Sequence, residues 1–173
     1  MKIFRKKIKA YSLLEILITL AIVTIIMVML TNVLFLTLDI ARKSFARSFV
    51  REEQNNLVTK IEKDIRNARF VESCEGEGET AMCEVYLHDM FIWTTCQREG
   101  KDPYVCKKDK NGNIIEGMSE AIRLDQFSFE EGLSDSPAKK SILLTLVVSH
   151  KDSKYEINNQ VRQIAISTRN YGI

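Results

Sequence analysis

Residues 7–20 read KIKAYSLLEILITL, and they place one acid, Glu15, in the first turns of a long apolar segment. Five basic residues lie within residues 1–10 and end at Lys9, and no acid accompanies them. A carboxylate at the edge of a hydrocarbon phase is costly unless it is paired or reaches water. Glu15 is therefore the first candidate functional residue of this chain.

The apolar segment is long enough to cross a membrane. Residues 16–38 form an uninterrupted run of 23 residues without a charge. As a helix this run extends about 35 Å, which exceeds the ~30 Å hydrocarbon core of a bilayer. Its polar members are one asparagine and four threonines, whose hydroxyls can bond to helix carbonyls. We expect a helix with a transmembrane half at residues 11–38.

Charge predicts the orientation of this span. Basic residues flank its N-terminal side more strongly than its C-terminal side, so residues 1–9 should stay in the cytoplasm and the rest should be exported. Without residues 1–10 the chain holds 20 basic and 23 acidic residues, which argues against a general nucleic-acid binder. A cleaved secretory signal fits poorly because its apolar region is shorter, whereas an uncleaved signal anchor remains an alternative.

The stretch from Ala10 to Glu15, after a basic leader and before an apolar run, resembles the N-terminal signal of type IV pilins and pseudopilins. The resemblance covers about residues 1–40. This chain differs from the family pattern in having Ala10 where glycine is usual and Tyr11 where phenylalanine is most common. Both replacements are conservative in size or ring chemistry.

The resemblance implies a leader at residues 1–10, cleavage by prepilin peptidase between Ala10 and Tyr11, and N-methylation of Tyr11. It implies no enzymatic activity and no cofactor. The implied partners are other pilin or pseudopilin subunits, the assembly platform membrane protein and the inner membrane. In this family the acid that corresponds to Glu15 would meet a new amine, and such a buried pair can fix the register of apolar helices. As an alternative, Glu15 reaches the headgroups as an ordinary interfacial acid.

The helix is expected to continue as an amphipathic half over residues 39–71. The chain has no glycine before Gly76 and no proline before Pro103, so nothing breaks the helix earlier. An apolar stripe recurs at helical spacing, formed by Phe45, Phe49, Leu57, Ile61, Ile65 and Ala68. Residues 57–71 should pack on a sheet, whereas residues 40–56 should contact other subunits.

Residues 72–173 are expected to form an exported, β-rich head. Strand-like segments occur at residues 85–88, 91–95, 122–129, 142–149 and 155–167, and Asn-Gly at residues 111–112 signals a hairpin. The predicted fold is therefore α+β and pilin-like, with one long N-terminal helix packed on an antiparallel sheet.

The four cysteines, Cys74, Cys83, Cys96 and Cys106, favour two disulfides in an oxidising compartment over a zinc site, because none shows C-x-x-C spacing. Three pairings are possible, and short loops favour Cys74–Cys83 with Cys96–Cys106. The acids between Cys74 and Cys83 lack the spacing of a calcium loop, so no metal is expected.

These features favour a minor pilin or pseudopilin, and the end of the chain loosely resembles the J-like and W-like minor group. Major pilins often carry glycine and proline near the positions of Thr24 and Asn32, and this chain does not. Pilus, type II secretion and competence systems all remain open. A DNA- or surface-binding tip pilin is an alternative, although acids interleave with the basic residues of the helix. The expected destination is the inner membrane, then the filament.

Overall fold

The computed structural model describes residues 13–87, 89–97, 99–132 and 141–168. The chain divides into two compact units, residues 1–42 and residues 43–173. One helix, α1 (Leu13–Asn67), begins in the first unit and ends in the second. Each unit is described below by itself.

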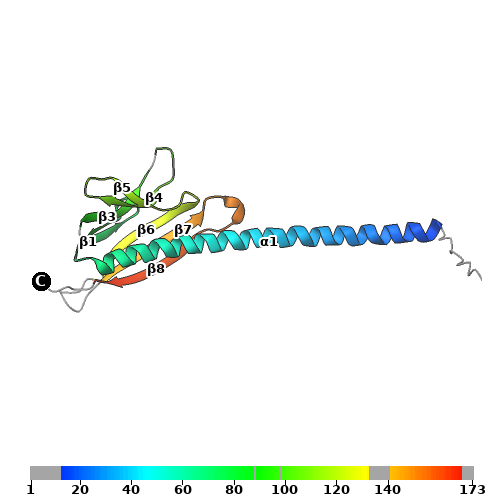
Figure 1. Ribbon diagram of the computed structural model, residues 1–173, viewed down its shortest axis with the longest axis horizontal. Helices are drawn as coiled ribbons and strands as arrows, with labels where there is room; N and C mark the ends of the chain where they lie inside the picture. The colour runs from blue at the N-terminus through cyan, green and yellow to red at the C-terminus, as the bar shows by residue number, and fades with distance from the viewer. Residues whose placement is uncertain (1–12, 88, 98, 133–140, 169–173) are drawn as a thin grey trace, which may run out of the picture. The chain divides into compact units, whose positions relative to one another are not determined.

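The second unit contains eight strands after the end of α1 (Figure 1). They are β1 (Phe70–Glu77), β2 (Met82–Tyr86), β3 (Met90–Cys96), β4 (Tyr104–Asp109), β5 (Ile114–Gly117), β6 (Ile122–Gly132), β7 (Ser141–His150) and β8 (Gln160–Ser167). Two short 3-10 helices, η1 (Gly78–Thr80) and η2 (Ser153–Tyr155), lie between strands.

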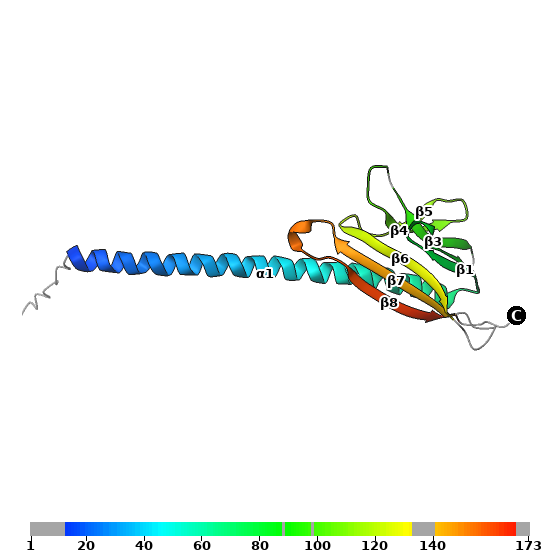
Figure 2. The ribbon, with the colours of Figure 1, turned by 180° about the vertical axis from the view of Figure 1, so that it is seen from behind.

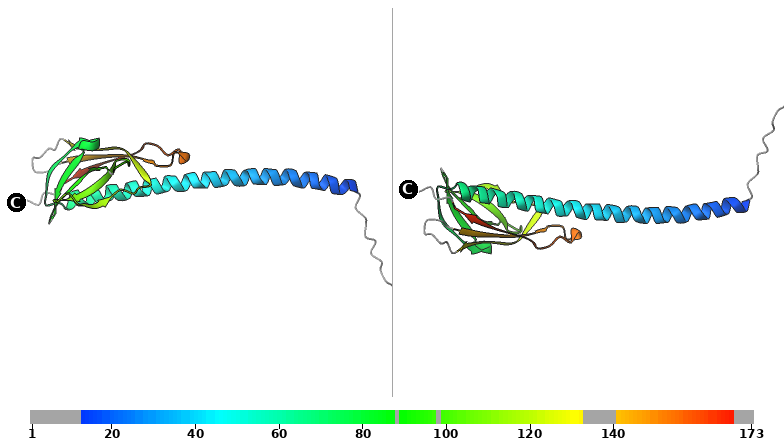
Figure 3. Two further views of the ribbon diagram at one scale, coloured as in Figure 1. Left: turned by 90° about the horizontal axis from the view of Figure 1, so that it is seen from above. Right: turned by 90° about the horizontal axis from the view of Figure 1, so that it is seen from below.

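The eight strands form one antiparallel sheet with the order β5-β4-β3-β2-β1-β6-β7-β8. Neighbours along the chain pair with one another except at β6, which pairs with β1 and so joins the two halves of the sheet. Figure 2 shows β6, β7 and β8 in front of the second-unit part of α1, and Figure 3 shows the helix and the sheet as separate layers. The predicted α+β fold is confirmed.

The stripe of α1 that packs on the sheet differs from the predicted stripe at its start. The buried positions are Ala46, Val50, Gln54, Leu57, Val58, Ile61 and Ile65. Phe45 and Phe49 are instead 76% and 38% exposed. Two apolar stripes are compatible with the helical period here, one that contains Phe45 and Phe49 and one that contains Ala46 and Val50. The stripe with the smaller side chains packs on the sheet.

The core lies between this stripe and the inner face of the sheet. Trp93, Phe127 and Phe129 are its largest fully buried side chains, and the two phenylalanine rings meet edge to face with centroids 4.9 Å apart. In β7 the residues of the 142–148 alternation, Ile142, Leu144, Leu146 and Val148, are all buried. This strand lies between β6 and β8, so it is an internal strand as expected.

Two residues of α1, Gln54 and Asp64, each make two hydrogen bonds to strands of the sheet. The buried Gln54 side chain donates from Nε2 to the carbonyl oxygens of Leu146, at 3.0 Å, and of Gln160, at 2.8 Å. One turn before the helix ends, Asp64 accepts from the Trp93 indole at 3.0 Å and from the Lys107 ammonium at 2.8 Å. Because these bonds need particular partners, they define the register of α1 on the sheet more closely than apolar contact can.

Two expected boundaries are also corrected by the structure. The helix ends at Asn67 rather than at residue 71. The segment after it forms the strand β1, which was not expected; Val71 and Cys74 are its buried residues, and a register shift lies between them. The last strand begins at Gln160 rather than at Tyr155, because η2 and the residues after it turn the chain first. The Asn-Gly hairpin lies between β4 and β5 as predicted.

Replacing Gln54 by leucine should destabilise the second unit by about 1–3 kcal/mol, because two buried carbonyl groups lose their donor. The measurement is urea unfolding of the full chain in detergent, followed by the fluorescence of Trp93, the single tryptophan. Asn56→Leu, at an exposed position of the same helix, is the matched control and should stay within about 0.5 kcal/mol of the parent. Equal effects of both variants would contradict the proposed role of the amide.

Candidate functional site

The first unit presents an uncovered apolar helix. The large apolar side chains of residues 13–38 are 50–77% exposed. Among the described residues, α1 is the one helix long and apolar enough to cross a membrane, and the apolar window is not buried inside the protein. An apolar surface of this extent is unfavourable in water, so it fits a protein anchored in a membrane.

The threonine hydroxyl groups of this segment donate hydrogen bonds to carbonyl oxygens of the same helix. Thr19 and Thr24 donate to the carbonyl oxygens of Ile16 and Ala21, at 2.9 and 2.8 Å. Thr31 and Thr37 donate to carbonyl oxygens three or four residues earlier. A helix whose backbone and hydroxyl groups are bonded internally leaves few polar groups to desolvate in lipid.

Glu15 is the one charged residue of residues 13–38. It lies in the first turn of the described helix and is exposed. Its carboxylate forms no hydrogen bond or ion pair with any other residue that the structure describes. Ala10 and Tyr11, the expected cleavage and methylation site, lie outside the described residues. The cation that would pair with Glu15 must therefore come from the N-terminal segment or from another molecule.

The four cysteines are paired in the second unit. Cys74 of β1 is joined to Cys83 of β2, which is its direct partner in the strand register. Cys96 of β3 is joined to Cys106 of β4. Both are short-range pairings, the same ones that loop length favours, and all four residues are buried. They close hairpins of the sheet rather than form a metal or redox centre.

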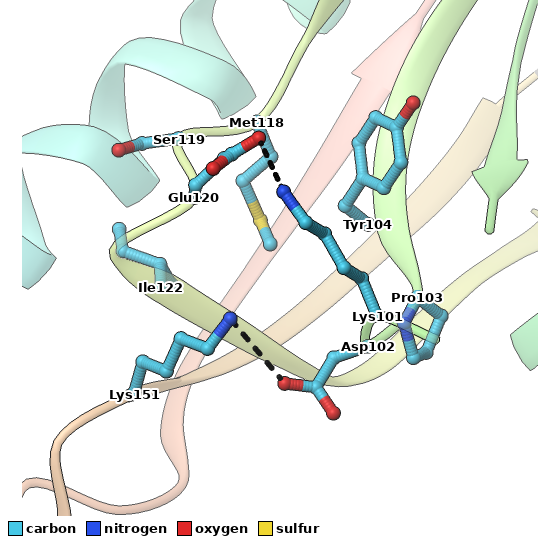
Figure 4. Close-up of a pocket in the computed structure, with 9 residues that line it drawn as sticks. All are labelled: Lys101, Asp102, Pro103, Tyr104, Met118, Ser119, Glu120, Ile122 and Lys151. Carbon is cyan, nitrogen blue, oxygen red and sulfur yellow. Dashed lines mark hydrogen bonds and ion pairs between the residues drawn. The ribbon is translucent and has the colours of Figure 1, made fainter. Parts of the chain in front are cut away.

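The second unit contains a small pocket with apolar and charged lining residues (Figure 4). Tyr104, Met118 and Ile122 are among its apolar lining residues. Two ion pairs line the rim, Lys101 with Glu120 at 3.2 Å and Lys151 with Asp102 at 3.9 Å. The cavity measures about 30 Å³, which suits one or two water molecules rather than a metabolite. The described residues also hold no cluster of His, Cys, Asp and Glu that could bind a metal.

Hydrogen bonds to two carboxylates, Glu72 and Asp109, shift the pKa of two groups in the second unit. Tyr86 donates its hydroxyl to Glu72 at 2.9 Å, and this bond, together with the nearby negative charge, raises the pKa of Tyr86. Asp109 closes the β4–β5 turn by accepting from Asn113 and from the Asn111 amide, and these bonds lower the pKa of Asp109. Both arrangements stabilise local structure at the surface.

Comparison with known proteins bears on the N-terminal segment. Residues 5–31 match the model of the prokaryotic N-terminal methylation motif. This match supports a type IV pilin-like family. No curated protein and no solved structure matches the chain. Type IV pilin-like proteins are processed structural subunits rather than enzymes, and the motif implies prepilin peptidase and other pilin subunits as partners.

The sequence pointed to the N-terminal segment but not to the surface features of the sheet. The contact between Tyr86 and Glu72 joins residues 14 positions apart, and the alternation of buried residues along β2 was its only sequence signal. Burial along β1 does not alternate, because a register shift separates Val71 from Cys74.

Replacing Glu72 by glutamine should lower the pKa of Tyr86 toward that of a free tyrosine, because the variant removes both the charged acceptor and its field. Glu84→Gln is the matched control and should have the smaller effect, since Glu84 acts only through its charge. The measurement is an NMR titration of the tyrosine ring signals. The raised pKa contributes stability below pH 10 that is lost as the pH rises through it, and an equal shift in both variants would contradict this assignment.

Proposed function

We propose that this chain is a structural subunit of a type IV pilus-like filament, inserted in the membrane as a prepilin. Prepilin peptidase would cleave between Ala10 and Tyr11 and methylate the new amine of Tyr11. The observation that carries the proposal is the methylation motif at residues 5–31, which overlaps the start of an uncovered apolar helix. The motif and the helix are needed together, because the helix alone would suit any membrane anchor.

Charge and cysteines support one orientation. The basic residues before the helix favour a cytoplasmic N-terminus, and residues 43–173 would then lie outside the cytoplasm. Two disulfides within that unit fit an oxidising compartment. The inner membrane would hold the chain until the assembly platform protein passes it into the filament.

Glu15 would set the register between the apolar helices of neighbouring subunits. Apolar helices that pack side by side can slide or rotate at low cost, whereas one buried polar pair selects a single arrangement. Cleavage before Tyr11 creates an amine four residues from Glu15, and a neighbouring subunit presents the same amine.

A minor position in the filament is the finer proposal. The apolar segment has no glycine or proline at which a helix could unwind, so the subunit would suit the start or the cap of a filament better than a deformable shaft. The filament could serve a pilus, a type II secretion system or a competence system. Its partners would be the other subunits of that system.

A DNA-binding tip role has less support. On the amphipathic part of α1, Arg66 pairs with Glu62 at 2.7 Å, and Lys60 is paired with Glu116. Side chains that are already paired lose part of their attraction for phosphate. The unprocessed signal anchor is the other alternative, and the first test below separates it from the proposal.

Mass spectrometry of the protein extracted from membranes tests the processing step. The expected N-terminus is an N-methylated Tyr11, because cleavage follows Ala10. A chain that keeps residues 1–10 would contradict the proposal and favour the anchored receptor. Ala10→Leu, which enlarges the residue before the cleaved bond, should accumulate the uncleaved form and serves as the control for the assignment of the bond.

Replacing Glu15 by alanine should leave export and cleavage intact but lower incorporation into filaments by about ten-fold or more, since the amine of the neighbour would be left unpaired. Glu15→Asp keeps the charge and should retain part of the incorporation. The measurement is quantitative immunoblotting of sheared filaments against membranes. Glu52→Ala removes an exposed acid of the same helix as a control, and normal incorporation of Glu15→Ala would refute the pairing.

A further inference from the structure

The outer face of β1, β2 and β3 presents aromatic and acidic side chains together. In the strand register Phe70 is opposite Tyr86, and Tyr86 is opposite Met90. Two residues along β2 on the same face, Glu84 is opposite Ile92. The residues between them, such as Val85, face the core. We call the outer residues Phe70, Met82, Glu84, Tyr86 and Ile92 the acid–aromatic face; Glu72, bonded to Tyr86, and Lys108, opposite Ile92, lie beside it.

This face is more apolar than an ordinary solvated sheet surface. Phe70 is 58% exposed and Met82 is 38% exposed, and the Phe70 and Tyr86 rings lie 5.9 Å apart. Glu84 forms no ion pair with any residue that the structure describes. A surface that combines exposed rings with a carboxylate favours a cationic side chain, whose stem covers apolar atoms while its head meets the acid.

The same chemistry already operates inside this protein. The Lys107 ammonium lies 3.9 Å from the centre of the Phe91 ring and 2.8 Å from the Asp64 carboxylate. Lys107 thus binds across a ring and an acid in the half-buried contact between α1 and the sheet. The acid–aromatic face offers a similar pair, Phe70 or Tyr86 with Glu84, at the surface.

A basic surface of the same chain is complementary to this face. Lys63, Arg66 and Arg69 are exposed at the C-terminal end of α1 and just after it. Lys63 forms no ion pair with any residue that the structure describes. The helix ends only a few residues before β1, so this basic surface lies at the same end of α1 as the start of β1. Both surfaces therefore lie at one end of the second unit, so two copies that point the same way present them at the same end.

We propose that the acid–aromatic face of one copy docks on the basic surface of a second copy, which is formed by Lys63, Arg66 and Arg69. The contact is heterologous, because two different surfaces meet, so each copy of a pair contributes a different face. Docking of two acid–aromatic faces on each other is disfavoured by the repulsion of their carboxylates. The inference deepens the proposed function by naming the neighbour as a second copy, and it rests on that function only for the parallel orientation.

Photo-crosslinking of the full chain in its own membranes tests the contact. A photoreactive residue at Met82 should yield a covalent dimer, with the link in the α1 segment that contains Lys63. The same probe at Ala165, exposed on β8, should not. Lys63→Glu and Glu84→Lys should each lower the dimer yield by about five-fold, and the two together should restore it to within about two-fold of the parent.

Lys154→Glu, a reversal at an exposed position in η2, is the matched control and should leave the yield unchanged. Trp93 fluorescence and the two disulfides report whether each variant is folded. Unchanged yields in both single variants, a double variant that stays low, or links to other proteins alone would overturn the proposal. Because the experiment needs no cleavage, its failure is distinct from an unmodified Tyr11, which would refute the proposed processing.

Discussion

The unbroken backbone hydrogen bonding of α1 is the constraint on which the rest of this structure depends. A segment in hydrocarbon has no water to bond, so its amide and carbonyl groups must be satisfied within the helix. The chain meets this requirement by placing no glycine before Gly76 and by bonding its threonine hydroxyls to helix carbonyls. The same helix then supplies the stripe that packs on the sheet, so one element serves two different environments.

The packed half of the helix is held by shape and by a few polar bonds. Val50, Ile61 and Ile65 are fully buried against the sheet, but apolar contacts tolerate small shifts along it. Gln54 and Asp64 tolerate less, since each satisfies particular partners on distant strands. The two disulfides lie within the hairpins β1–β2 and β3–β4. They therefore stabilise the half of the sheet that runs from β5 to β1, away from β8.

The comparison of the inner and outer faces of the sheet shows how one kind of chemistry can serve folding and association. Inside, Lys107 meets Phe91 and Asp64 and ties β4 to α1. Outside, the acid–aromatic face offers rings and a carboxylate but no lysine of its own. The proposed contact between copies would extend the inner arrangement to a second chain. It would also add a contact in the head to the contact proposed for Glu15 in the membrane.

The sequence by itself determined the apolar span, the motif around Ala10 and Glu15, and the internal strand β7, because each depends on neighbours along the chain. Only the tertiary structure decided which helix residues face the core, since Phe45 and Val50 satisfy the helical period equally well and packing on the sheet distinguishes them. The strand β1 and the acid–aromatic face were also beyond the sequence. They depend on pairings such as Phe70 with Tyr86, in which residues far apart in the chain become neighbours across strands.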